Sequence, residues 1–169
     1  MAEDGLVTKI REAATGKDSD KVQDGELVSH KFIIAGILNK RYAVPATVIR
    51  EIVIDVPIHY VPFVPPYIRG FINRHGEPYT VVDLSVLFEQ EETKERAFLV
   101  LNLGSDQLAF LVSDIHEIVK VPETDVYPIT EKGEDGGYFS SSVRLGTEDV
   151  FIVAVEAVRK RLADDLGAP

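Results

Sequence analysis

Any reactive site in this chain of 169 residues has to be built without cysteine, because the sequence contains none. Disulfides, thiolate nucleophiles and cysteine metal sites are therefore excluded. Asp83 ends a valine-rich segment and could act as a catalytic carboxylate, but capping of the turn at residues 84–88 explains it more simply. Glu51 and Glu117 stand at equivalent places in two similar segments, as an acid–base pair might. Two copies of one structural role, each carboxylate on the solvent face of its strand, are the simpler interpretation.

The sequence also lacks the patterns of a metal site, a serine nucleophile and a phosphate-binding loop. Residues 140–142 are serines without the small-residue elbow of a serine nucleophile, and residues 133–137 lack the lysine and helix start of a phosphate loop. The histidines are scattered, with no pair at i, i+4 and no acidic cluster at metal-ligand spacing: His30, His59, His75 and His116. We therefore expect no catalytic residues, no metal and no cofactor, and predict that the protein is not an enzyme.

Charge and hydropathy narrow the class of partner. The formal net charge is −10, which repels nucleic-acid phosphates and anionic membrane surfaces, and the basic pair Lys40-Arg41 is small. The longest apolar runs fall short of the roughly 18 residues that a membrane span needs, and the first residues lack a basic segment followed by an apolar one. We expect a soluble cytoplasmic protein that binds no nucleic acid and does not insert into a membrane.

The elements that position these residues are mostly strands. Residues 1–29 are polar and charged and predict a flexible arm, whereas residues 30–155 show short strand-like runs separated by turn signals. Two glycines bracket a polar turn within residues 70–84, which predicts a β-hairpin. A terminal amphipathic helix over residues 156–166 is predicted by apolar residues at helical spacing: Val155, Val158, Leu162 and Leu166.

A weak internal repeat indicates two similar units. Residues 42–53 resemble residues 108–119 at a constant offset of 66 residues, and both segments end in Glu-Ile-Val. Several short strands per period suit small β-barrels, whose closure removes exposed edges. We predict an all-β domain over residues 30–166, with subdomains of approximately 30–95 and 96–155 that are joined by the charged run at residues 89–96 and may exchange strands.

Several motifs together resemble the CheW-like family of chemotaxis coupling proteins. They are Tyr42-Ala43-Val44-Pro45, Val48-Ile49-Arg50-Glu51-Ile52, Pro65-Pro66-Tyr67-Ile68-Arg69-Gly70, Val81-Val82-Asp83-Leu84 and Leu101-Asn102-Leu103-Gly104. The resemblance covers roughly residues 31–162. It implies two SH3-like five-stranded β-barrels side by side and a non-enzymatic adaptor. Such an adaptor joins the cytoplasmic tip of chemoreceptors to the regulatory domain of a histidine kinase of the CheA type.

The resemblance departs from the family pattern at one turn. The family usually has Asn-Leu-Arg-Gly where this chain has Asn73-Arg74-His75-Gly76, so the arginine stands one position upstream. The resemblance implies partner contacts from the turn and from an apolar groove between the barrels: Val48, Ile49, Glu51, Ile52, Gly70, Asn73, His75, Gly76, Ile115 and Ile118. Two alternatives stay open, an adaptor of another chemosensory pathway such as surface motility, and a small-ligand-binding β-barrel.

Overall fold

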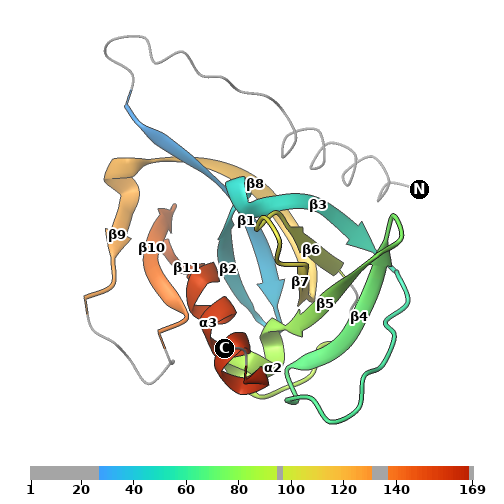
Figure 1. The fold of residues 1–169 in the computed structure, drawn as a ribbon. Coiled ribbons are helices and arrows are strands. Elements are labelled where there is room, and N and C mark those ends of the chain that lie inside the picture. The colour runs from blue at the N-terminus through green and yellow to red at the C-terminus, as the bar shows by residue number, and fades with distance from the viewer. Residues whose placement is uncertain (1–26, 95–96, 131–136, 168–169) are drawn as a thin grey trace.

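The computed structural model describes residues 27–94, 97–130 and 137–167 and contains two β-sheets and two α-helices in this part of the chain (Figure 1). The predicted N-terminal arm lies, up to residue 26, outside the described residues. The strands are β1 (Ser29–Ile37), β2 (Lys40–Pro45), β3 (Ile49–Ile54), β4 (Ile68–Arg74), β5 (Glu77–Asp83), β6 (Ala97–Leu101), β7 (Leu108–Val112), β8 (Asp114–Pro122), β9 (Val126–Pro128), β10 (Phe139–Leu145) and β11 (Glu148–Val153). The helices are α2 (Leu84–Glu89) and α3 (Val155–Leu166), and short 3-10 turns occupy Ala46–Val48 and Glu123–Asp125.

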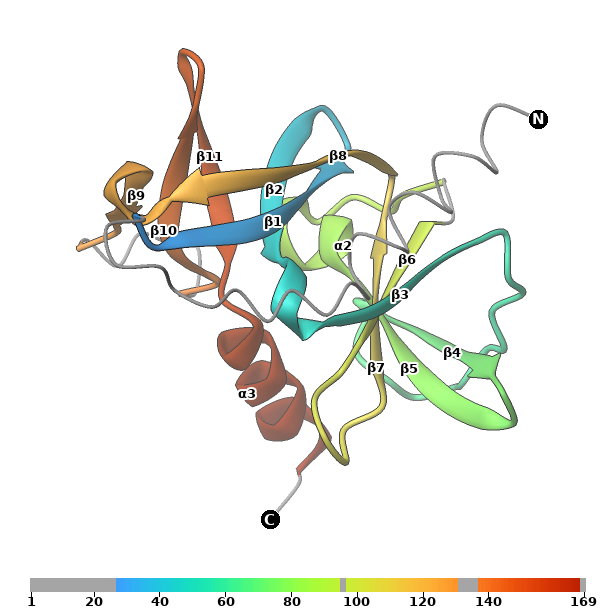
Figure 2. The same ribbon diagram turned by 90° about the horizontal axis from the view of Figure 1, so that it is seen from above.

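Each sheet is strongly curved and forms one barrel-like subdomain, and Figure 2 shows the two side by side. The six-stranded barrel has the strand order β8-β1-β2-β11-β10-β9, and the five-stranded barrel has the order β3-β6-β7-β5-β4. This confirms the predicted all-β fold with two SH3-like barrels, except that one barrel has six strands instead of five. The predicted C-terminal helix is α3, which begins one residue earlier than expected.

The chain passes between the barrels twice, and the predicted division near residue 95 is wrong for this reason. β1 and β2 belong to the six-stranded barrel, β3 to β7 form the five-stranded barrel, and β8 returns to the first one. Each repeated segment contains one of these passages, from β2 to β3 in residues 42–53 and from β7 to β8 in residues 108–119. The subdomains are therefore not continuous in sequence. The charged run lies in the sequence between β5 and β6, which belong to the same barrel, so it does not join the two barrels.

Three groups of buried side chains explain why the barrels form one unit. One group lies inside the five-stranded barrel around Phe98, and another lies inside the six-stranded barrel around Ile34. The largest group joins both barrels and includes Ile33 of β1, Phe110 of β7 and Val158 of α3. Burial of apolar surface is worth about 25 cal/mol per Å², so this shared core stabilises one arrangement of the two subdomains.

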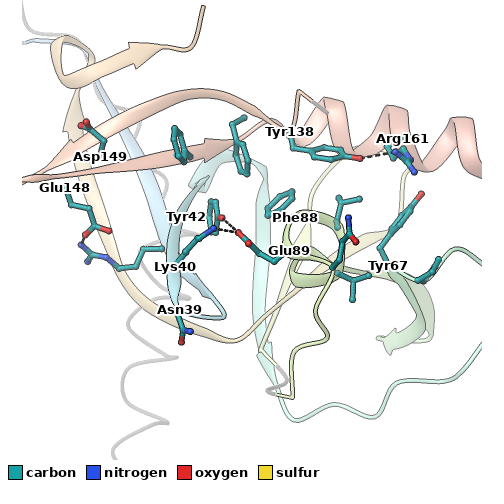
Figure 3. Close-up of a pocket in the computed structure, with 17 residues that line it drawn as sticks. Asn39, Lys40, Tyr42, Tyr67, Phe88, Glu89, Tyr138, Glu148, Asp149 and Arg161 are labelled. Atoms are coloured by element: carbon teal, nitrogen blue, oxygen red, sulfur yellow. Dashed lines mark hydrogen bonds and ion pairs between the residues drawn. The ribbon is translucent and has the colours of Figure 1, made fainter. Parts of the chain in front are cut away.

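A polar contact also links the barrels at the end of α2 (Figure 3). Lys40 Nζ lies 2.6 Å from Glu89 Oε1, and the hydroxyl of Tyr42 donates to the same oxygen at 3.0 Å. The nearby Lys40 ammonium is the main cause that lowers the pKa of Glu89. A lowered carboxyl pKa contributes stability above the ordinary pKa of the group, and that contribution is lost as the pH falls through the folded-state value.

We therefore expect Glu89→Gln to lower the free energy of unfolding by about 0.5 kcal/mol at neutral pH, since Lys40 is largely exposed to solvent. The difference from wild type should shrink as the pH falls through the lowered folded-state pKa of Glu89, because the wild-type carboxylate becomes protonated as well. Urea denaturation at several pH values measures both effects. Glu91→Gln, on an exposed neighbour, is the control, and an equal effect of this change would contradict the assignment to the contact.

Candidate protein-binding surface

The tip of the β4–β5 hairpin is a tight, exposed turn of the five-stranded barrel. His75 and Gly76 form the turn with φ values of 53° and 85°, so both residues have the left-handed backbone of tight hairpin turns. The side-chain Oδ1 of Asn73 accepts a hydrogen bond from the amide of Gly76 at 3.0 Å, which holds the turn closed. Asn73, His75 and Gly76 are all exposed. The predicted hairpin is confirmed, and its tip presents the His75 imidazole to solvent.

Arg74, which stands just before the tip at the end of β4, reaches β3, the strand at the opposite end of the sheet order. Its Nε donates to Glu51 Oε1 at 2.7 Å and its second guanidinium nitrogen donates to Oε2 at 3.0 Å, a forked pair that also raises the pKa of Arg74. The exposed fractions of the two side chains are 21% for Arg74 and 14% for Glu51. The prediction that Glu51 lies on the solvent face is therefore wrong. Charge-assisted pairs of this kind are strong and directional, so the pair fixes the hairpin against β3.

Glu51 and Glu117 do not share a site. Glu51 belongs to β3 of the five-stranded barrel, whereas Glu117 belongs to β8 of the six-stranded barrel. Glu117 is exposed and lies 3.6 Å from a guanidinium nitrogen of Arg41. Each glutamate is paired with a different arginine, and the two differ in exposure, so the equivalent positions in the repeat do not have the same surroundings.

Gly70 is not part of the exposed tip. It is buried in β4, where its φ is 125° and the β4–β5 register shifts. The main chain of the preceding loop crosses directly over it, and an added Cβ would lie 2.0 Å from the carbonyl oxygen of His59. The expectation that Gly70 makes a partner contact is corrected, because its role is to admit the close approach of another backbone.

The predicted apolar groove residues divide into two groups. Ile49 and Ile52 are 4% and 1% exposed and belong to the core that joins the barrels, so their side chains are not available to a partner. The expectation was wrong for these two because alternation along a strand does not distinguish a barrel interior from a surface groove. Three other residues are half-buried and pack against the same core from its edge: Val48, Ile115 and Ile118. Ile115 and Ile118 lie on β8 opposite Ala35 and Ile33 of β1.

Two surface features were missed from the sequence. The β3–β4 loop exposes Tyr60 and Phe63, and a signal for it was present in the aromatic residues placed among prolines in residues 57–66. A cavity of about 800 Å³ between β2, α2 and β11 is lined by an aromatic cluster that includes Tyr42, Phe88 and Phe139 (Figure 3). Its aromatic rings come from segments far apart in the sequence, so no local pattern could indicate it.

Neither a metal-binding group nor a membrane-spanning helix is found in the described residues. Among residues 27–94, 97–130 and 137–167, no group of three or more histidine, aspartate or glutamate side chains is arranged to bind a metal ion. In the same part of the chain, no helix has both the length and the apolar character to cross a membrane.

Comparison with known proteins agrees with this architecture. The chain is 26% identical over 160 residues to the chemotaxis protein CheW of Helicobacter pylori, covering 92% of this chain and 94% of that protein. It is 28% identical over 99 residues to CheW of Bacillus subtilis, which covers 57% and 64% of the two chains. The crystal structure of the scaffolding protein TtCheW from Thermoanaerobacter tengcongensis has a similar fold, with a TM-score of 0.68, 20% identity and coverage of 75% and 89%. Residues 31–162 match the CheW-like domain, and the chain therefore belongs to the CheW-like domain family.

Proposed function

We propose that this chain is a cytoplasmic, non-enzymatic chemotaxis adaptor that couples chemoreceptors to a histidine kinase. The observation that carries the proposal is the CheW-like match over residues 31–162, which includes all strands of both barrels except the first two residues of β1. A relative that matches over 92% of this chain carries the name chemotaxis protein CheW. The mechanism is simultaneous binding of two partners, so that a change in one is transmitted to the other as a coupling free energy.

Two surfaces of the chain are the proposed contacts. The hairpin tip with Asn73, His75 and Gly76 is exposed and held rigidly by the Arg74–Glu51 pair, which suits docking of the regulatory domain of the kinase. Val48, Ile115 and Ile118 leave part of their apolar area exposed near the passages between the barrels, which suits an amphipathic helix at the receptor tip. Glu51 acts through Arg74 by positioning the hairpin.

We expect His75→Asp to weaken binding of the kinase regulatory domain about tenfold, equivalent to about 1.4 kcal/mol, because the exposed imidazole at the tip is replaced by a carboxylate. Aspartate tolerates the left-handed backbone at this position, so the hairpin should still form. Isothermal titration calorimetry with the purified kinase domain measures the change.

The matched control is Thr147→Asp, which adds the same charge to the exposed β10–β11 turn of the other barrel. Equal affinity of the His75→Asp variant and wild type would remove the hairpin tip from the kinase interface. If the wild-type chain binds neither a receptor tip fragment nor a kinase regulatory domain, the proposed function is wrong.

A further inference from the structure

The loop between β3 and β4 holds a phenylalanine in an unfavourable conformation. The side chain of Phe63 is fully exposed, and Tyr60 beside it is 80% exposed. Phe63 has a φ of 60° directly after Pro62, a turn position at which glycine or asparagine is preferred. A bulky residue in this backbone region is strained, and a ring that is fully exposed to water contributes no burial energy to offset the strain. Aromatic residues held in this way are typical of the anchors of protein interfaces.

An apolar cavity of about 560 Å³ lies next to this phenylalanine. Its lining includes Val61 and Val64, the residues on either side of the Pro62–Phe63 turn, together with Ile68 of β4 and Leu162 and Leu166 of α3. It is an open groove at the surface and is wide enough to receive a phenyl ring. The cavity accordingly has the size and the apolar character of a socket for an aromatic side chain.

The charges around the cavity favour an uncharged occupant. Arg159 and Asp106, the charged residues of the lining, are paired with each other, and Arg159 also contacts Glu156. At the other end of the loop, the Tyr67 hydroxyl donates to Asp165 of α3 at 2.7 Å. This hydrogen bond fixes the helix next to the loop, so the socket is formed before anything enters it.

We propose that a second copy of this chain occupies the surface, with Phe63 of each copy inserted into the cavity of the other. An exposed ring and an apolar socket on the same face are self-complementary, because a two-fold rotation satisfies both contacts at once. The contact is small compared with interfaces of about 800 Å² per partner, so we expect a weak dimer with a dissociation constant of about 100 µM. The net charge of −10 on each copy opposes association, and salt screens this repulsion. The proposal does not depend on the proposed adaptor function.

Sedimentation velocity of the full chain, from about 10 µM to about 1 mM, tests the dimer. We expect the weight-average sedimentation coefficient to rise with concentration, and to rise more at about 500 mM salt than at about 50 mM. Phe63→Asn should weaken association at least tenfold with no fall in melting temperature, because asparagine accepts the left-handed backbone. Phe151→Asn, at an exposed phenylalanine of the six-stranded barrel, is the control and should associate as wild type does.

A cross-linking experiment tests the geometry, since the chain has no cysteine of its own. A mixture of the single variants Phe63→Cys and Leu166→Cys should form a disulfide-linked heterodimer faster than either variant alone forms a homodimer. A wild-type chain that stays monomeric over the whole range at high salt would overturn the proposal. So would a Phe63→Asn variant that dimerises like wild type, or one that loses binding of another protein while self-association is unchanged.

Discussion

Gly70→Ala should destabilise the protein by about 3 kcal/mol or more, the largest effect of any single methyl group added at a described glycine of a strand or hairpin turn. The new Cβ would lie 2.0 Å from the carbonyl oxygen of His59 and 2.9 Å from the carbonyl carbon. The loop cannot retreat without loss of two hydrogen bonds, from the His59 amide to the Phe71 oxygen at 2.8 Å and from the Phe71 amide to the His59 oxygen at 2.9 Å. The φ of 125° adds backbone strain, because residues with a Cβ rarely adopt it.

Gly76→Ala separates the clash from the backbone strain. Gly76 also has a positive φ, of 85°, but an added Cβ there meets no atom within 4 Å. We expect a cost of about 1 kcal/mol for this variant, which comes from backbone strain alone. Urea denaturation followed by circular dichroism compares the two variants. Equal losses in the free energy of unfolding would mean that the approach of the His59 backbone over β4 is not what requires Gly70.

Asp83→Ala should cost about 2–3 kcal/mol, because the Asp83 carboxylate caps α2 from a fully buried position. Its Oδ1 accepts hydrogen bonds from the amides of Ser85 at 2.9 Å and Val86 at 3.3 Å, and its Oδ2 accepts one from Arg69 at 3.0 Å. Alanine would leave the two helix amides without an acceptor in the protein interior. The prediction that Asp83 caps the segment that follows it is confirmed by this geometry, and that segment is the helix α2.

Asp83→Asn is the matched variant, since its amide oxygen can still cap the helix. Burial is the main cause that raises the pKa of Asp83, which means that the negative charge is poorly solvated there despite the Arg69 guanidinium. Replacing the charged group with a neutral one should therefore cost less than removing the acceptor, about 1 kcal/mol. Thermal or urea denaturation at pH 7 gives both values. A loss for the asparagine variant as large as that for alanine would show that the ion pair dominates over the cap.

The order of these effects bears on the proposed binding surface. Gly70 and Asp83 hold the β3–β4 loop and α2 against the five-stranded barrel, whereas the hairpin tip at His75 extends away from the core. Variants at Gly70 and Asp83 should change the amount of folded protein. Variants at His75 should change how the folded protein binds its partner. Binding measurements on Gly70 variants should therefore be interpreted only after their unfolding curves are known.

The sequence by itself determined the features that depend on neighbouring residues. The β4–β5 hairpin followed from two glycines around a polar turn, the cap at Asp83 from an acidic residue directly before a predicted turn, and α3 from apolar spacing. The repeat at 66 residues and the motifs that resemble the CheW-like family also lie in the sequence itself. The hairpin, the cap and the helix each follow from a few adjacent residues, where backbone preference and side-chain chemistry leave few alternatives.

Only the tertiary structure decided which barrel each strand joins and which apolar residues reach the surface. Ile49 and Val48 are adjacent in the sequence, yet one lies in the shared core and the other lies at its edge. The same holds for the pair between Arg74 and Glu51, and for the cavity beside Phe63, which is completed by α3 from the end of the chain. These features depend on the pairing of strands that are distant in sequence. A period of two along a strand shows that one face is apolar but does not identify what that face packs against.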